Sequence, residues 1–148
     1  MATTPDGADA EEDLNELYDW LLQFAKTQLA KHGEFLPFGA TMDLKGKIQP
    51  AMAATGDERQ ESHDLMVLLS QRFREQARSK EIRAAAQCVD MRINEPERTP
   101  MRDAIMLLLE HRSGASLIVY YPYAKRESGH LEYGDAFTLT NSERNFFR

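Results

Sequence analysis

The N-terminal part of the chain carries one apolar stripe at helical spacing. Its members recur three and four positions apart: Leu14, Leu17, Tyr18, Leu21, Phe24, Ala25 and Leu29. This is the period of an amphipathic helix with one buried face. Acidic residues precede the stripe, basic residues close it, and Gly33 follows as a residue that can end a helix at positive φ. We therefore predict a helix from Ala10 to about His32, preceded by a flexible acidic tail over residues 1–9. Trp20 lies off the centre of the stripe, which places it at a core border or a contact surface.

The next pattern is that of a β-hairpin over residues 34–55. Asp43 and Gly46 occupy the first and fourth positions of a turn, where Asp bonds its own backbone and Gly supplies a positive φ. Pro37 and Pro50 cannot donate to a strand ladder, so we expect them at an edge or a bulge. The glycines do not match a phosphate-binding loop, because Gly46-Lys47 is followed by Ile48 rather than by Ser or Thr.

A second helix is predicted to open at Gly56-Asp57, with Asp57 and Gln60 spaced as in a capping box. Its apolar face would consist of Leu65, Met66, Leu69, Phe73, Gln76 and Ala77. Basic residues gather at its end and just beyond: Arg72, Arg74, Arg78, Lys80 and Arg83. Two interpretations stay open for them, a solvated helix face and a site for an anionic partner.

The second half of the chain has the alternation of strands. Residues 82–88 and 89–93 alternate on opposite parities, which indicates either a bulge near Cys88 or a central strand buried on both faces. A strand over Asp103–His111 would pair with Ser116–Tyr123 around the turn 112–115. A last strand would cover Leu131–Leu139 with a kink at Gly134, followed by a short helix capped by Asn141 or Ser142.

The fold class follows from the order of these elements, α-β-β-α-β-β-β(-β)-α. Strands interrupted by helices without strict βαβ alternation predict an α+β fold with an antiparallel sheet. We expect five to six strands with two main helices packed on them, in a single domain over residues 10–148. The order resembles the profilin-like and roadblock-like folds, and a resemblance of element order implies no activity.

Composition narrows the functional classes. The formal net charge of −6 argues against nucleic-acid binding, which needs a basic surface. The N-terminus lacks the basic and apolar regions of a signal peptide, and the longest apolar run, Ala104–Leu109, is far shorter than the ~20 residues of a membrane span. A single cysteine permits no intramolecular disulfide. We therefore expect a soluble cytoplasmic protein that binds neither nucleic acid nor membrane.

Few residues of the sequence are candidates for catalysis or metal binding. Cys88 is a lone nucleophile candidate, but free cysteines more often serve as small buried apolar residues. Glu110 and His111 are neighbours on a predicted strand, so their side chains would point to opposite faces. The histidines at 32, 63, 111 and 130 do not have the spacing of metal ligands. We assign no catalytic residue, no metal and no cofactor from the sequence.

The sequence thus favours a non-enzymatic interaction module that binds a protein partner or its own copy. The residues expected at the interaction surface are Trp20, Arg74, Arg78, Tyr120, Tyr121, Tyr123 and Tyr133. One alternative is an acidic inhibitor or immunity-type protein that covers a basic site on an enzyme. Another is a small hydrolase or transferase using Cys88, or a carboxylate paired with His111 or His130.

Overall fold

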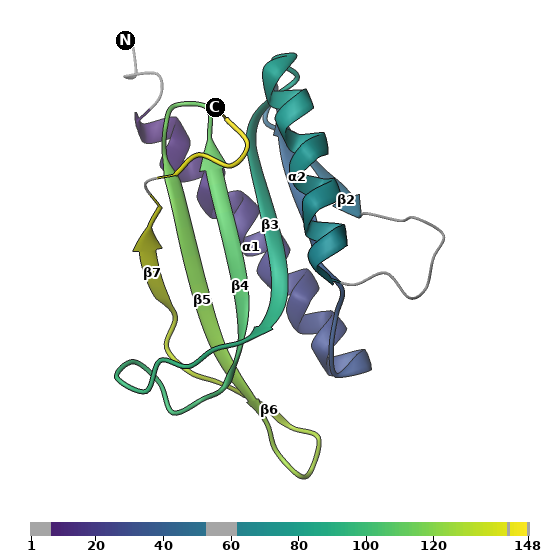
Figure 1. Ribbon diagram of the computed structural model, residues 1–148, viewed down its shortest axis with the longest axis vertical. Coiled ribbons are helices and arrows are strands. Elements are labelled where there is room, and N and C mark those ends of the chain that lie inside the picture. Colours follow the sequence, from purple (N-terminus) through teal and green to yellow (C-terminus); the bar gives the residue numbers. More distant parts are fainter. Residues whose placement is uncertain (1–6, 53–61, 142, 148) are drawn as a thin grey trace.

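The computed structural model describes residues 7–52, 62–141 and 143–147, and it shows an antiparallel sheet with one helix on each face (Figure 1). The helices are α1 (Gly7–His32) and α2 (Ser62–Arg78). The strands are β1 (Phe38–Asp43), β2 (Ile48–Met52), β3 (Ile82–Arg92), β4 (Asp103–His111), β5 (Ser116–Lys125), β6 (Leu131–Tyr133) and β7 (Phe137–Thr140). The predicted α+β class with an antiparallel sheet is confirmed, and the order of the elements matches from α1 through the strands that follow α2.

The sheet has seven strands in the order β2-β1-β3-β4-β5-β6, and β7 also pairs with β5. The count exceeds the expected five to six because the predicted last strand is two strands. The break falls at Gly134, whose N–H donates to the carbonyl of Pro122 at 2.9 Å. Residues 134–136 then interrupt the ladder, and the chain continues along the same edge of β5 as β7, with the register shifted by one residue. The predicted strand over Asp103–His111 is β4, and its hairpin with β5 is confirmed.

Strand β3 is the centre of the fold. Ala84, Ala86 and Cys88 are buried in the core under α1, whereas Ala85 is buried in the core under α2. On the α2 side, Gln87 donates to the carbonyl of Met66 at 3.0 Å and to Ser70 Oγ at 2.8 Å, so its amide is satisfied in the core. The change of parity in the sequence therefore reflects a strand covered on both faces.

The β1–β2 hairpin is closed by local chemistry, as predicted. Asp43 Oδ1 accepts the N–H groups of Lys45 and Lys47 at 2.9 Å each, and these backbone bonds, that of Lys47 first, lower the pKa of Asp43. Gly46 has φ 89°. Pro50 lies on the edge strand β2, opposite Ala40. Gly39 is fixed by packing, since a Cβ there would stand 2.4 Å from the carbonyl oxygen of Ala86.

Helix α2 ends in a Schellman-type turn. The N–H of Glu81 donates to the carbonyl of Gln76 at 2.9 Å, and that of Lys80 to Ala77 at 3.1 Å. Lys80 takes the left-handed conformation, with φ 57°, that glycine usually provides at this position. The predicted start of this helix at Gly56-Asp57 lies outside the described residues.

The expected C-terminal helix is wrong for the described residues 143–147, which form bends and no helix. The reason is a long-range carboxylate. Glu110, at the end of β4, is fully buried and accepts the backbone N–H groups of Asn145, Phe146 and Phe147. In an α-helix these N–H groups would point along the helix axis. Because they point to Glu110 instead, residues 145–147 lie in an irregular conformation against β4. The predicted cap Ser142 lies outside the described residues.

Candidate functional site

A groove runs along the side of α1 that faces the β1–β2 hairpin. It consists of two adjoining hollows of about 630 and 710 Å³, which share Phe24 and Gln28 in their walls. The first is closed by the segment after α1, the start of β1 and the end of β2, and its apolar lining is Phe24, Phe35, Leu36, Pro37, Phe38 and Met52. The second follows α1 toward its N-terminus and includes Trp20 and Ile48. Along α1 the groove extends from Glu16 to His32, which at ~1.5 Å per residue is about 24 Å.

Aromatic stacking shapes the groove. The ring of Trp20 stacks on Phe24 at 5.6 Å, and Phe24 packs against Phe38 at 4.7 Å. Leu36 and Met52, by contrast, are 64% and 53% exposed. Large apolar side chains exposed beside an apolar hollow mark interaction sites more often than scattered surface residues do.

The groove is bordered mainly by carboxylates. Glu34 and Asp90 line the first hollow, and Glu16 and Asp19 line the second. The same side of α1 continues in a shallower hollow lined by Glu11, Glu12, Asn15, Glu16 and Asp19. Lys31 and His32 are the basic side chains in the walls of the two main hollows. The potential along the groove is therefore negative and favours a basic ligand.

Asp90 is held at the border of the groove by a buried tyrosine. The hydroxyl of Tyr123 donates to Asp90 Oδ1 at 2.5 Å. Burial raises the pKa of Asp90, and burial together with the Asp90 bond raises that of Tyr123. Asp90 therefore keeps its proton to a higher pH than an ordinary aspartate.

The predicted aromatic residues are divided between the two faces of the sheet. Tyr121, Tyr123 and Tyr133 lie on the α1 face, where Lys26 Nζ stands 4.7 Å and 4.6 Å from the ring centres of Tyr121 and Tyr133. Tyr120 is on the opposite face and stacks on Phe137 at 5.2 Å. The tyrosines therefore do not form one surface, and three of them contribute to the packing of α1.

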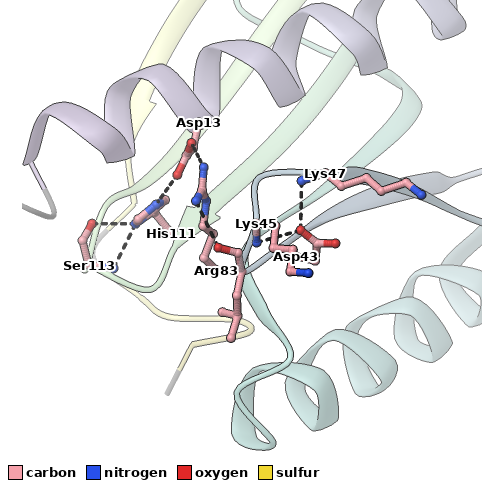
Figure 2. Close-up of polar contacts among 8 residues, drawn as sticks. Asp13, Asp43, Lys45, Lys47, Arg83, His111 and Ser113 are labelled. Carbon is pink, nitrogen blue, oxygen red and sulfur yellow. Dashed lines mark hydrogen bonds and ion pairs between the residues drawn. The ribbon is translucent and has the colours of Figure 1, made fainter.

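His111 has a carboxylate partner, Asp13. Figure 2 shows the side chains of Asp13, His111, Ser113 and Arg83 in contact. His111 Nε2 lies 2.9 Å from Asp13 Oδ2, and Arg83 donates to Asp13 Oδ1 at 2.8 Å. Asp13 and His111 are both buried, at 4% and 1% exposure. Glu110 points to the other face of the sheet, as strand alternation predicts.

The hydrogen bonds indicate a structural role for this network. The N–H of Ser113 donates to His111 Nδ1 at 3.1 Å, which leaves the imidazole proton on Nε2, facing Asp13. The Ser113 hydroxyl stands 3.0 Å from the same Nδ1, so it shares that one lone pair with its own backbone. A general base needs this lone pair for its substrate. The network instead joins α1, β3 and the β4–β5 turn.

Cys88 is fully buried in the core under α1. Burial first, and the nearby Asp90 carboxylate second, raise the pKa of its thiol well above the ordinary value. The reactive form of cysteine is the thiolate. Its surroundings therefore favour the role of a small apolar residue.

Two of the predicted interaction residues meet in another hollow, on the α2 side of the sheet. Arg74 and Arg78 line it together with Arg112, from the β4–β5 turn, and Arg144, from the C-terminal segment. Arg83 is directed to Asp13 instead. The sequence placed Arg74 and Arg78 together but gave no signal for the two distant arginines.

The groove residues after α1 were missed by the sequence reasoning. Phe35, Leu36 and Phe38 belong to an apolar run that follows Gly33, outside the helical stripe. That run was interpreted as the first flank of a hairpin, whereas the strand begins only at Phe38. The available signal was an apolar run that begins at Phe35, three residues before the strand does.

No protein-family model matches this chain, and comparison with curated proteins and with solved structures finds no match. In the described part of the chain, no group of three or more His, Cys, Asp or Glu side chains is placed to hold a metal ion. Within the same residues, no helix is both long and apolar enough to cross a membrane.

Proposed function

We propose that the protein is a non-enzymatic interaction module whose groove along α1 receives an apolar segment of a partner protein that also carries basic residues. One observation carries this proposal: an apolar groove with exposed Leu36 and Met52 is bordered by Glu16, Asp19, Glu34 and Asp90. Amphipathic segments bind such grooves through apolar anchors, and the charged border selects among them.

The shape of the groove favours a peptide over a compact small molecule. Two hollows side by side along about 24 Å of helix accept successive anchors of a helix or an extended segment. Burying one large apolar side chain contributes roughly 1.5–3 kcal/mol, so each anchor that enters a hollow offsets part of the cost of association. Methionine at the border suits adaptable contacts.

The alternative of a hydrolase or transferase receives less support. Its thiol version needs a thiolate at Cys88, where burial favours the thiol. Its His111 version needs a free lone pair on that ring, which the N–H of Ser113 occupies. Its His130 version places the histidine in the exposed turn between β5 and β6, where no ion pair among the described residues joins it to a carboxylate. The inhibitor alternative is a special case of the proposal, in which the basic segment belongs to an enzyme.

Selection from a random peptide library on the immobilised full chain tests the proposal. We expect the selected peptides to combine apolar residues with Lys or Arg, and Leu36→Asp to weaken their binding at least tenfold, since interface anchors commonly contribute over 1.4 kcal/mol. Val67→Asp is the matched control, because Val67 is a 41% exposed apolar residue on α2, outside the groove.

Selected peptides that are acidic, or that bind wild type and Leu36→Asp equally, would contradict the proposal. Light scattering of wild type and Leu36→Asp tests whether the groove binds a second copy of this chain. A wild-type dimer that Leu36→Asp converts to a monomer would make a second copy of this chain the occupant, in place of a different partner.

A further inference from the structure

A four-arginine pocket lies on the α2 side of the sheet, away from the α1 groove. Its walls are formed by Arg74 and Arg78 of α2, Arg112 of the β4–β5 turn, Arg144 of the C-terminal segment, and Phe146 and Phe147. Figure 1 shows the C-terminal segment crossing the sheet toward the end of α2, beside the turn between β4 and β5. Three stretches that are far apart in the sequence therefore bring four permanent cations to one hollow.

The arginines are positioned by the fold. Arg74 and Arg78 are four residues apart and thus lie on one face of α2. Arg74 Nε donates to the carbonyl of Asn145 at 2.7 Å, a bond that does not use its two terminal nitrogens. Arg144 donates to the carbonyl of Phe147 at 3.0 Å, and its guanidinium stands against Gly114 of the turn. Arg74 and Arg144 are therefore held at the pocket by backbone contacts before any ligand arrives.

The segment that carries Arg144 is itself anchored. Glu110 accepts three backbone N–H groups of residues 145–147 and also the side-chain amide of Asn145, at 2.9 Å. The ring of Phe146 meets Phe73 edge-on, with centres 5.3 Å apart. Preorganisation of this kind lowers the entropic cost of binding a ligand.

The lining of the pocket is rich in positive charge within the described residues. Its lining contains no Asp or Glu, and no ion pair joins Arg74, Arg78 or Arg112 to a described carboxylate. This occurs in a chain whose formal net charge is −6. The carbonyls of Gln76 and Ala77 at the end of α2 are occupied by the N–H groups of Glu81 and Lys80, which weakens the negative end of the helix dipole.

We propose that this pocket binds a phosphate group, as free phosphate or as the monoester or diphosphate of a small molecule. Guanidinium groups match phosphate oxygens in bidentate geometry. A phosphate monoester carries about −1.5 to −2 charges on three terminal oxygens, whereas a carboxylate offers one charge on two oxygens. The volume of about 240 Å³ lies below the ~300–1,000 Å³ of sites that enclose a drug-sized ligand, so the pocket suits a small ion or the head of a larger molecule.

Calorimetric titration of the full chain with inorganic phosphate, pyrophosphate and acetate, at equal ionic strength, tests this site. We expect the two phosphate ligands to bind and acetate not to bind. Arg78→Ala and Arg112→Ala should each lower the phosphate affinity about tenfold, as loss of one charge-assisted contact does. Both residues are exposed, so the fold should be retained, and unfolding in urea checks this for each variant. Tighter binding of pyrophosphate than of phosphate would show that the pocket accommodates a diphosphate, and the reverse order, against the larger charge of pyrophosphate, would identify a monoester or free phosphate as the ligand.

Arg72→Ala is the matched control, because Arg72 is an exposed arginine of the same helix outside the pocket. It should leave the phosphate affinity unchanged. The proposal is overturned if wild type does not bind phosphate or pyrophosphate at millimolar concentration, if acetate binds equally well, or if Arg72→Ala weakens binding as much as Arg78→Ala. A single-stranded oligonucleotide would also be tested. If it binds more tightly than pyrophosphate, and if Arg72→Ala weakens its binding as much as Arg78→Ala does, the proposal is overturned in favour of a diffuse nucleic-acid-binding surface.

Discussion

Changing Glu110 to Gln should release the C-terminal segment from the sheet. Each Glu110 oxygen accepts two donors: Oε2 takes the backbone N–H and side-chain amide of Asn145 at 2.7 and 2.9 Å, and Oε1 takes the N–H groups of Phe146 and Phe147 at 2.9 and 3.3 Å. Glutamine has nearly the same shape, but one of its two terminal groups is a donor. Two of the four donors would then face another donor in a site with no exposure to water.

The magnitude follows from the two lost bonds. A hydrogen bond to a charged group contributes about 1.5–3 kcal/mol, so two lost bonds set an upper range of about 3–6 kcal/mol. Part of this cost is avoided if residues 145–147 detach from the sheet, because water can then hydrogen-bond to their N–H groups. Leaving exposes Phe146 and Phe147, each of which contributes roughly 1.5–3 kcal/mol by burial. We therefore expect a loss near 3 kcal/mol in the local free energy that holds residues 145–147.

Hydrogen exchange of the amides of Phe146 and Phe147 measures this local free energy. A loss of about 3 kcal/mol should speed their exchange roughly a hundredfold, since ~1.4 kcal/mol corresponds to a factor of ten. Glu143→Gln, a change at an exposed acid in the same segment, should leave the rates unaltered. Exchange within threefold of wild type in Glu110→Gln, with equal stability in urea, would refute the claim that the carboxylate holds the segment.

Three further predictions concern stability. Asp13→Ala removes the buried acceptor of Arg83 and His111 and should cost about 3–5 kcal/mol in urea unfolding. Lys80→Gly relieves a left-handed conformation and should stabilise the protein by about 0.5–1 kcal/mol in the same assay. Asp90→Asn tests the raised pKa of Asp90. The folded protein binds the Asp90 proton more tightly than the unfolded chain does, so wild type gains stability relative to the variant as the pH falls from above the folded-state pKa of Asp90 to its unfolded-state pKa. Unfolding curves between neutral pH and pH ~4 should thus show a more stable variant at neutral pH and a vanishing difference in acid.

Each of these has a neighbouring control. Glu12→Ala removes an exposed acid next to Asp13 and should change stability by less than about 0.5 kcal/mol. Ser79→Gly, one residue before the left-handed position, should not stabilise. A difference between wild type and Asp90→Asn that stays constant over the pH range would show that Asp90 titrates alike in the folded and unfolded chains.

Local chemistry made much of the fold predictable. The helical stripe of α1 and its end at Gly33 depend on residues three and four apart, and the turn at Asp43 and Gly46 depends on bonds within five residues. The parity change in β3 indicated a strand covered on both faces, which the structure has. Strand alternation also separated Glu110 from His111 without any knowledge of what either contacts.

The candidate sites needed contacts that the sequence does not encode locally. Asp13 and His111 are 98 positions apart, and only the packing of α1 against β4 makes them partners. The C-terminal residues carry a local preference for a helix, yet the buried carboxylate of Glu110 binds their N–H groups and decides otherwise. A long-range bond in a buried site is worth more than the weak propensity of a short segment.

The sequence by itself determined which faces of its helices and strands are apolar, since periodicity is a property of neighbours along the chain. Only the tertiary structure decided which side chains stand together at the surface. Arg74 and Arg78 became a phosphate-sized pocket because the β4–β5 turn and the C-terminal segment add Arg112 and Arg144. Leu36 and Met52 became the border of a groove because the hairpin packs beside α1. The physical reason is the same in both cases: a binding site is a convergence of distant residues, and convergence is set by packing.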